Sequence, residues 1–370
     1  MKYYIIAGEA SGDLHASNLI KEIKIKDKHA EICAWGGDLM ATQGAKIEKH
    51  YRELAFMGFA EVLMNLRTIL SNINTCKKNI ENFQPDVLIL VDYPGFNLRI
   101  AEWAHQKTYK IVYYISPQIW AWKKNRVHKI KKFVDDMIVI LPFEKEFYAK
   151  YNYSVSYVGH PLLDALPTTI SNKQKFIKEH QLKTKPIIAL LPGSRKQEIK
   201  KMLLIMLSQI QLFPNYQFII AAAPSIEDSF YKEIIGHNNV SIIKDKTHRL
   251  LQNSHAALVT SGTATLETAL IGVPEVVCYK GNRLSYEIAK RIVDIKYISL
   301  VNLIMDEEVV TELIQENFNP KNLETELNKI LTGTPREIVL QKYKLLKEKL
   351  GDGGASEKAA EIAVENGTNK

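Results

Sequence analysis

Cysteine is scarce in this sequence, and its placement excludes two kinds of site. Only three cysteines occur among the 370 residues, and they lie far apart in the chain: Cys33, Cys76 and Cys278. This spacing matches neither a disulfide framework nor a cysteine-based zinc motif. It favours a reducing compartment, so we expect a protein that works inside the cell.

Long apolar runs and acidic charge are also lacking. No apolar stretch approaches the roughly 18 residues that a membrane-spanning helix needs, and the N-terminus lacks the pattern of a signal peptide. Lysine and arginine number 49 against 41 acidic residues, which gives a net charge of +8. We therefore expect a cytosolic protein with an anionic partner, which is a nucleic acid, a phosphorylated substrate or an anionic membrane surface.

Two signatures of bound cofactors are missing as well. The loop 8–13 after the first predicted strand does not follow the pattern Gly-x-Gly-x-x-Gly, so no NAD site is predicted. No Asp-x-Asp pair stands at the end of a predicted strand, where such carboxylates would hold a divalent cation. The sequence therefore predicts chemistry without a cofactor and without a metal.

Short apolar segments alternate with helical segments along the whole chain. Strands are predicted over 3–7, 32–35, 86–91, 110–115, 137–141, 155–158, 186–191, 218–223, 240–243, 256–259 and 274–279. This alternation is typical of an α/β fold built from doubly wound, Rossmann-like parallel sheets. We place one domain over 1–165 and another over 166–339, facing each other across a cleft. The basic tail is predicted to be helical over about 340–370 and to end in a partly disordered glycine-rich run.

Acidic residues follow two strands of the first domain. Asp92 comes directly after a strongly apolar strand, at the edge where open α/β sheets place their chemistry. A lone carboxylate among aromatic residues suits a general base, although Asp is also a common turn initiator. Glu9 and Asp13 lie in the loop after the first strand, where carboxylates suit sugar hydroxyls or a helix cap. For Asp13 we expect the cap, and for His160 a structural histidine.

Two loops of the second domain have the composition of phosphate sites. Each follows an apolar strand, contains small residues and precedes a helix, whose first N–H groups and positive dipole end suit an anion. The residues are Gly193, Ser194 and Arg195 in one loop, and Ser261, Gly262 and Thr263 in the other. The alternative is an ordinary strand-to-helix turn with a surface arginine.

Two further polar residues of this domain are candidates for a nucleotide-sugar site. Glu267 follows Thr263 by one helical turn, so its carboxylate either reaches a ribose hydroxyl or completes a capping box. Asn302 stands alone in apolar surroundings, where its amide needs partners, and a ligand would be one.

Two stretches of the first domain suit a lipid or a membrane surface. Residues 55–70 carry an apolar helical face broader than an ordinary core stripe, which includes Met57, Phe59, Val62, Leu63 and Leu66. A core-facing helix and an exposed patch for an acyl chain are both consistent with it. Trp120 and Trp122 precede a basic stretch that begins with Lys123 and Arg126, as in interfacial anchors beside anionic headgroups. A nucleic-acid groove and a solvated basic face are the alternatives.

Six short motifs, in this order, resemble the lipid-A-disaccharide synthase family. They are Gly-Glu-Ala-Ser-Gly-Asp at 8–13, Ser-Pro-Gln-Ile-Trp-Ala-Trp at 116–122, Leu-Pro-Phe-Glu at 141–144, Gly-His-Pro at 159–161, Leu-Pro-Gly-Ser-Arg at 191–195 and Ser-Gly-Thr-Ala at 261–264. The resemblance extends over residues 1 to about 305. It implies a GT-B glycosyltransferase of family 19.

The resemblance also implies a reaction and partners. The enzyme would join UDP-2,3-diacylglucosamine to 2,3-diacylglucosamine 1-phosphate, with inversion, to give the β-1,6-linked lipid A disaccharide 1-phosphate and UDP. It would act peripherally at the inner face of the inner membrane of a Gram-negative cell, in lipopolysaccharide biosynthesis. It would need no nucleic acid, and its C-terminal helix would pack back on the first domain or be exchanged within a homodimer.

Residue roles follow from the same motif match. Asp92 takes the position of the family's proposed base, Glu9 lies in the loop that faces the acceptor, and Arg195, Glu267 and Asn302 take donor-site positions. The apolar face of 55–70 and the basic stretch then become acceptor or membrane contacts. One departure is Gly95, where many members carry a second acid.

Two other functions remain open at this point. The first is another UDP-sugar enzyme with this fold, either an N-acetylglucosaminyl transferase or a UDP-sugar epimerase. The second is a nucleotide-sugar binding protein without turnover.

Overall fold

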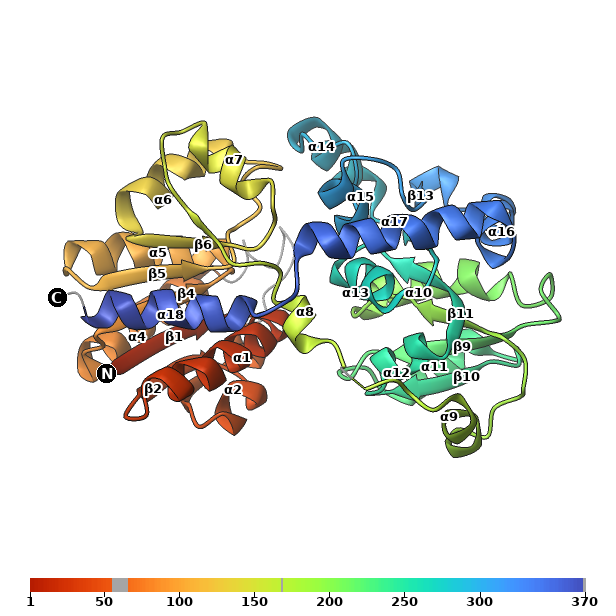
Figure 1. Cartoon of the computed structure of the whole chain (residues 1–370), viewed down its shortest axis with the longest axis horizontal. Coiled ribbons are helices and arrows are strands. Elements are labelled where there is room, and N and C mark those ends of the chain that lie inside the picture. Colours follow the sequence, from red (N-terminus) through yellow and green to blue (C-terminus); the bar gives the residue numbers. More distant parts are fainter. Residues whose placement is uncertain (55–65, 168, 369–370) are drawn as a thin grey trace. The chain divides into compact units, whose positions relative to one another are not determined.

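The computed structural model describes residues 1–54, 66–167 and 169–368, and these form two compact units. Unit 1 comprises Met1–Ala165 together with Leu350–Lys370, and unit 2 comprises Leu166–Lys349. Each unit is a parallel sheet with helices on both faces, so the predicted α/β fold of two doubly wound domains is confirmed (Figure 1). After passing through unit 2, the chain returns to unit 1 with the segment Leu350–Lys370.

The sheet of unit 1 contains seven parallel strands in the order β3-β2-β1-β4-β5-β6-β7. The strands are β1 (Lys2–Ala7), β2 (Glu31–Gly36), β3 (Lys46–His50), β4 (Val87–Val91), β5 (Lys110–Tyr114), β6 (Asp136–Val139) and β7 (Ser156–Tyr157). The helices are α1 (Ala10–Lys26), α2 (Asp38–Thr42), α4 (Leu66–Phe83), α5 (Pro94–Gln106), α6 (Val127–Phe133), α7 (Glu144–Ala149), α8 (Leu162–Ala165) and α18 (Ala355–Thr368). The central strand β4 is buried at every residue because helices cover both faces of the sheet.

The sheet of unit 2 contains six parallel strands in the order β10-β9-β8-β11-β12-β13. The strands are β8 (Ile187–Leu191), β9 (Gln217–Ala222), β10 (Ser241–Lys244), β11 (Ser254–Thr260), β12 (Glu275–Tyr279) and β13 (Glu312–Ile314). The helices are α9 (Lys173–Glu179), α10 (Lys196–Leu207), α11 (Asp228–Ile235), α12 (Thr247–Gln252), α13 (Thr263–Ile271), α14 (Arg283–Ile292), α15 (Leu300–Met305), α16 (Pro320–Leu331) and α17 (Thr334–Leu350).

The strand order of each sheet reverses direction at one point. In unit 1 the reversal lies between β1 and β4, and in unit 2 it lies between β8 and β11. In doubly wound sheets the loops that leave such strands run to opposite faces, and ligands usually bind beyond the carboxyl ends of these strands. The strand-end residues predicted as site candidates belong to these loops.

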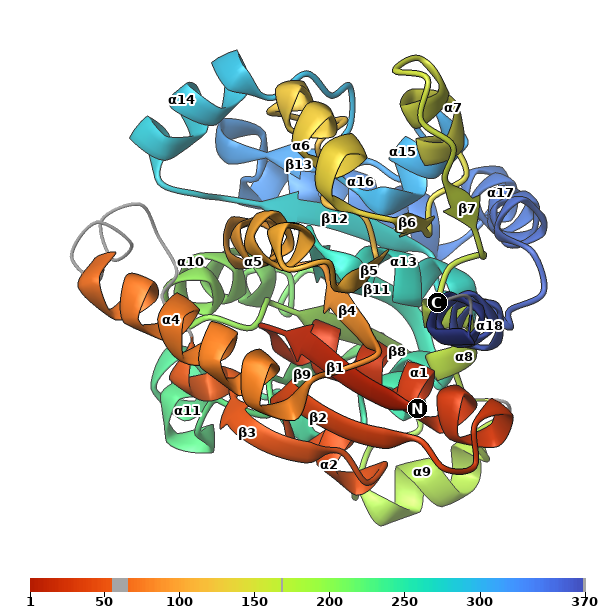
Figure 2. The same cartoon turned by 90° about the vertical axis from the view of Figure 1, so that its left-hand side faces the viewer.

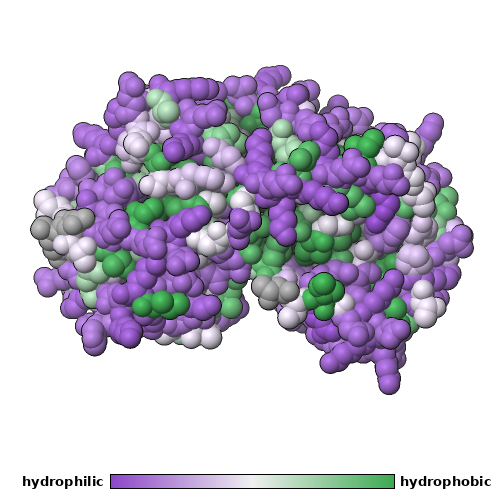
Figure 3. Space-filling model, in the orientation of Figure 1, coloured by the Kyte–Doolittle hydropathy of each residue, from purple (hydrophilic) through white to green (hydrophobic). Residues whose placement is uncertain are grey.

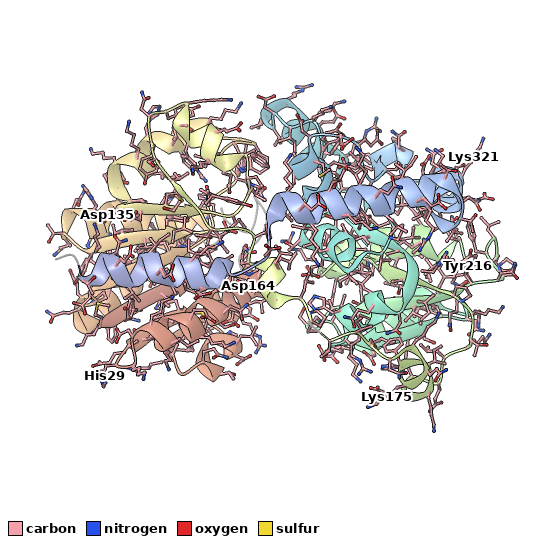
Figure 4. All side chains as sticks on the ribbon, viewed as in Figure 1. His29, Asp135, Asp164, Lys175, Tyr216 and Lys321 are labelled. Carbon is pink, nitrogen blue, oxygen red and sulfur yellow. The ribbon has the colours of Figure 1, made fainter. Side chains whose placement is uncertain are left out.

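The end of the described chain is ordered, which corrects the prediction of a partly disordered tail. Residues after the glycine-rich turn form α18, whose buried face is made of alanines: Ala355, Ala359, Ala360 and Ala363. These small side chains let α18 pack closely along α1, as Figures 1 and 2 show. Asp164, labelled in Figure 4, accepts hydrogen bonds from the N–H groups of Gly354 (2.7 Å) and Ser356 (2.8 Å) and so caps α18. The sequence predicted one helix over about 340–370, whereas the structure has two, α17 and α18, separated by the glycine-rich turn.

Apolar side chains at the surface are dispersed. On the face shown in Figure 3 they form small patches among polar residues. Within the described residues, no helix has the length and apolarity that crossing a bilayer requires.

Candidate active site

Asp92 lies at the reversal point of unit 1 in an unusual backbone conformation. Val91 pairs with Ala7 on one side and Tyr114 on the other, so Asp92 stands level with the start of the β1 loop. Asp92 and Tyr93 have φ angles of 44° and 49°. Left-handed conformations of non-glycine residues cost about 1–3 kcal/mol each and persist only where neighbours enforce them. Two such residues in succession mark this loop as a constrained site.

Three hydrogen bonds hold the Asp92 backbone in place. Its N–H donates to the carbonyl of Tyr114 (3.1 Å). Its carbonyl accepts from the Tyr113 hydroxyl (2.6 Å) and from the side-chain amide of Asn97 (2.8 Å). Tyr113 and Asn97 are fully buried. Both residues were missed at the level of sequence, because only the sheet register brings Tyr113 beside Asp92.

The surroundings of the Asp92 carboxyl favour its neutral, protonated form. Burial raises its pKa to about 6, the negative charge of Glu9 adds to the rise, and the Tyr93 N–H opposes it. Glu9 itself is exposed, at the end of the β1 loop, where it precedes α1. A carboxylate with a pKa near 6 is a stronger base than an ordinary aspartate and is still ionised at pH 7. The loops after β1 and β4 therefore bring the carboxylates of Glu9 and Asp92 within electrostatic range of each other.

Two glycines near Asp92, Gly8 and Gly95, differ in whether the space around them requires glycine. Gly8 is required, because a Cβ there would overlap the ring of Tyr93. Gly95, by contrast, has no atom within 4 Å of an added Cβ, so the surrounding space does not demand glycine there. The negative charge that acts on the Asp92 carboxyl is that of Glu9.

Asp13 is a helix cap, as predicted, and not part of the chemistry. Its buried carboxylate accepts hydrogen bonds from Gly37 N (2.8 Å), Leu39 N (3.1 Å) and Met40 N (3.2 Å), at the start of α2. His160 is likewise structural: burial lowers its pKa to about 3, helped by His15, and its Nδ1 accepts from Leu162 N. Helix α1 begins at Ala10, earlier than predicted, so the 8–13 motif is mostly helix.

The two tryptophans of the basic stretch have different environments. Trp120 is 9% exposed and packs edge-on against Phe143 with ring centroids 4.9 Å apart. It is buried in this structure, and its role as an acceptor or membrane contact stays a prediction. Trp122 is 40% exposed. The Lys123 ammonium lies 4.3 Å from the centroid of its ring and the Arg126 guanidinium lies 5.6 Å from it.

Most of the predicted apolar face lies outside the described residues. This applies to Met57, Phe59, Val62, Leu63 and the side chain of Leu66. Helix α4 continues from there, with Ile73, Cys76 and Ile80 buried and Leu70 53% exposed. The role of this face stays a prediction.

The first phosphate loop of unit 2 follows β8. Gly193 has φ 107°, and a Cβ there would lie 2.7 Å from a carboxylate oxygen of Glu198, so glycine is required. Ser194 and Arg195 are exposed, and Arg195 precedes the first residue of α10. Burial raises the pKa of Tyr279, Glu198 adds to the rise, and Arg195 opposes it. Arg195 therefore lies close to the end of β12 as well as to its own helix.

The second phosphate loop follows β11, next to β8 in the sheet. Ser261 donates its N–H to Cys278 O (3.0 Å) and its hydroxyl to Ile298 O (3.1 Å), so the loop is fixed to its neighbours. Gly262 and Thr263 are exposed, and no side chain caps the start of α13. The alternative of a capping box for Glu267 is therefore wrong. The Glu267 carboxylate lies 3.6 Å from the His248 ring nitrogen instead.

Asn302 does not present its amide to a ligand in this structure. It is fully buried, and its Oδ1 accepts from Val309 N (2.8 Å) and Val310 N (3.0 Å). Its Nδ2 donates to Val310 O (2.8 Å) and to the Glu312 carboxylate (2.9 Å). These four bonds use the full hydrogen-bonding capacity of the amide. The side chain holds the segment before β13, which corrects the prediction of a direct donor contact.

The candidate groups are carboxylates in unit 1, and helix N–H groups with the Arg195 cation in unit 2. Among the residues that the structure describes, no group of three histidine, cysteine or acidic side chains is placed to hold a metal ion. The carboxylates of unit 1 suit proton removal, and the helix starts of unit 2 suit an anionic leaving group.

Comparisons with known proteins agree on one family. The model of the lipid-A-disaccharide synthetase family matches residues 3–365. A lipid-A-disaccharide synthase of Syntrophus aciditrophicus is 38% identical over 97% of this chain and 96% of its own length. Those of Geobacter metallireducens and Coxiella burnetii are 37% and 36% identical, over 98% and 97% of this chain and 96% of theirs.

Solved structures resemble the fold at low identity. A UDP-GlcNAc 2-epimerase of Neisseria meningitidis bound to UDP-GlcNAc has a TM-score of 0.68 at 15% identity, over 99% of this chain and 100% of its own. The glycotransferase of kitacinnamycin has a TM-score of 0.66 at 12% identity, over 99% and 98%. At such identities the likeness concerns the fold alone, which is that of GT-B enzymes.

Proposed function

The chain belongs to the lipid-A-disaccharide synthase family, a family of disaccharide-forming glycosyltransferases, and from this premise we propose its substrates and residue roles. It joins UDP-2,3-diacylglucosamine to 2,3-diacylglucosamine 1-phosphate and gives the β-1,6-linked disaccharide 1-phosphate and UDP. The observation that carries the chemistry is Asp92, which is held at the reversal point of unit 1 with a pKa of about 6.

In the proposed reaction Asp92 acts as the general base. Its carboxylate takes the proton from the 6-hydroxyl of the acceptor, whose oxygen forms a bond to the anomeric carbon of the donor. The bond from that carbon to the diphosphate breaks, and UDP leaves with the electron pair. A single displacement of this kind inverts the anomeric centre from α to β. Glu9 tunes the base.

Unit 2 is proposed to hold the UDP. The loops at 193–195 and 261–263 offer helix N-termini to the diphosphate, and the Arg195 guanidinium adds a charge that stabilises the leaving group. Glu267 is proposed to contact the ribose. Solved UDP-GlcNAc 2-epimerases that resemble the fold are only 13–15% identical to this chain, so they add no argument for epimerisation.

The same proposal includes peripheral binding of the enzyme to a membrane. Diacylated substrates reside in a bilayer, so the enzyme would act peripherally at the inner face of the inner membrane. The apolar face of 55–70 and the exposed Trp122 would contact the acyl chains or the surface. A homodimer that exchanges α18 between its protomers belongs to the same proposal.

The deciding assay measures UDP release. We expect release from UDP-2,3-diacylglucosamine in the presence of the lipid acceptor, and none from UDP-N-acetylglucosamine. Conversion of UDP-N-acetylglucosamine into an epimeric UDP-sugar without any acceptor would favour an epimerase, and UDP binding without release would favour a binding protein.

The pH dependence of kcat/KM should reveal the coupling of the two carboxylates, because this ratio reports the pKa values of the free enzyme. Only ionised Asp92 accepts a proton, so kcat/KM should fall as the pH drops through about 6, the raised pKa of this group. Glu9→Gln removes the negative charge that helps to raise that pKa. The acid limb should therefore move to lower pH, by about half a unit to one unit. An unmoved limb would remove Glu9 from the environment of the base.

Arg195→Ala should weaken UDP binding. The variant removes one charged contact to the diphosphate, and a hydrogen bond to a charged group contributes about 1.5–3 kcal/mol, so Kd should rise about 10- to 100-fold. Isothermal titration calorimetry with UDP measures the change. Lys200→Ala is a matched control, because Lys200 is an exposed cation further along α10. Equal affinities in both variants would remove Arg195 from the donor site.

A further inference from the structure

Two cations gather on one exposed indole in unit 1. Lys123 and Arg126 both lie over the ring of Trp122. Lys123 precedes the short 3-10 helix Lys124–Arg126, and Arg126 is its last residue. Lys123 has φ 54°, a left-handed conformation that turns the chain tightly at this point. The two positive side chains are thereby held together on a surface that an incoming ligand can reach.

Among the described residues, no acid forms an ion pair with Lys123 or Arg126, whereas Lys129 on α6 forms an ion pair with Glu102 (3.0 Å). Burial lowers the pKa of Lys123, and the Arg126 charge lowers it further. Like charges held together without a counter-ion are unfavourable, and an anion placed between them would relieve the repulsion.

The pair lies near the proposed base. Burial raises the pKa of Tyr113, Asp92 and Tyr148 add to the rise, and the Arg126 guanidinium opposes it. The Tyr113 hydroxyl is the group that donates to the Asp92 carbonyl at 2.6 Å. Arg126 is therefore on the side of the sheet where Asp92 is held, within electrostatic range of the same hydroxyl.

We propose that Lys123 and Arg126 form a binding site for a phosphate monoester, and that its occupant is the phosphate of the sugar acceptor. The proposal rests on the proposed function and adds the group that orients the acceptor. Arg126 suits two phosphate oxygens at once because its guanidinium is planar, and Lys123 supplies a point charge. Trp122 holds both stems in place. The site thereby selects an acceptor that carries phosphate over one that does not.

The test compares two acceptors in two proteins. Transfer is measured with 2,3-diacylglucosamine 1-phosphate and with 2,3-diacylglucosamine, in the wild type and in the double variant Lys123→Ala/Arg126→Ala. With the phosphorylated acceptor we expect KM to rise about 30-fold or more, which is the loss of at least one strong charged contact. With the unphosphorylated acceptor the two proteins should be alike. Lys132→Ala, which removes a cation lying over the Phe133 ring, is the control and should change neither.

Each other outcome has a definite meaning. An equal loss with both acceptors would overturn the phosphate site. The phosphate site would also be overturned if the double variant kept the wild-type ratio of the two KM values but no longer sedimented with phosphatidylglycerol vesicles. The cations would then serve an anionic membrane surface. If the double variant does not fold, Arg126→Gln and Arg126→Lys replace it, and Arg126→Lys should recover part of the preference for phosphate. Absence of transfer in the wild type would reject the proposed function itself and not this site.

Discussion

Asp92→Asn should abolish transfer. General-base catalysis contributes about 10²- to 10⁴-fold, so we expect kcat to fall about 1,000-fold while the Kd for UDP changes less than twofold. Asparagine has the same shape and tolerates the left-handed conformation of residue 92. The backbone bonds to Tyr113 and Asn97 involve the carbonyl of residue 92 and would remain. Single-turnover measurement of UDP release isolates the chemical step.

The matched control for this substitution is Asp135→Asn. Asp135, labelled in Figure 4, precedes β6 at the amino end of the same sheet and accepts a hydrogen bond from Ile111 N (2.8 Å). The same chemical change at that end should leave kcat unaltered. A variant Asp92→Asn that keeps a tenth or more of the wild-type kcat would rule out Asp92 as the base.

Asn302→Ala should lower the free energy of unfolding more than any other substitution proposed for this chain. The change removes partners from the N–H groups of Val309 and Val310, the carbonyl of Val310 and the carboxylate of Glu312. Buried groups left without partners cost about 1–3 kcal/mol each, and partial relaxation should reduce the sum to about 3–5 kcal/mol. Urea denaturation, followed by a probe in unit 2, measures the effect.

The control for Asn302 uses another asparagine of unit 2. Asn319 caps α16 by accepting from Asn322 N (3.0 Å), so Asn319→Ala should cost only about 1 kcal/mol. If Asn302→Ala left stability unchanged but weakened UDP binding tenfold, the direct donor contact predicted from the sequence would be restored.

The architecture could be predicted from the sequence because its signal is local. Each apolar run followed by a small-residue loop and a helical segment specifies one strand and one crossover, and right-handed crossovers then leave few ways to order a parallel sheet. The pairing of Glu9 with Asp92 was accessible for the same reason. Both residues follow strands that a doubly wound sheet places side by side at its reversal point.

The features that sequence reasoning missed depend on contacts between distant residues. Trp120 and Trp122 are equivalent in the sequence, and only the packing of Trp120 against Phe143 separates a core residue from a surface one. Asn302 was recognised as a buried amide in need of partners, but its partners come from the turn before β13. Tyr113 gave no signal at all, because its hydroxyl reaches the Asp92 carbonyl only through the pairing of β4 with β5.

The return of α18 to unit 1 affects the order in which the protein can fold during synthesis. Helix α18 packs on α1 and on β4 and β5, yet the ribosome makes it only after all of unit 2. At about 5–20 residues per second, the nascent first unit waits on the order of ten seconds or more with that surface uncovered. Unit 2 is continuous in the chain and meets no such delay. We therefore expect unit 2 to be the first to reach its native state on the ribosome, and unit 1 to be the one that needs protection meanwhile.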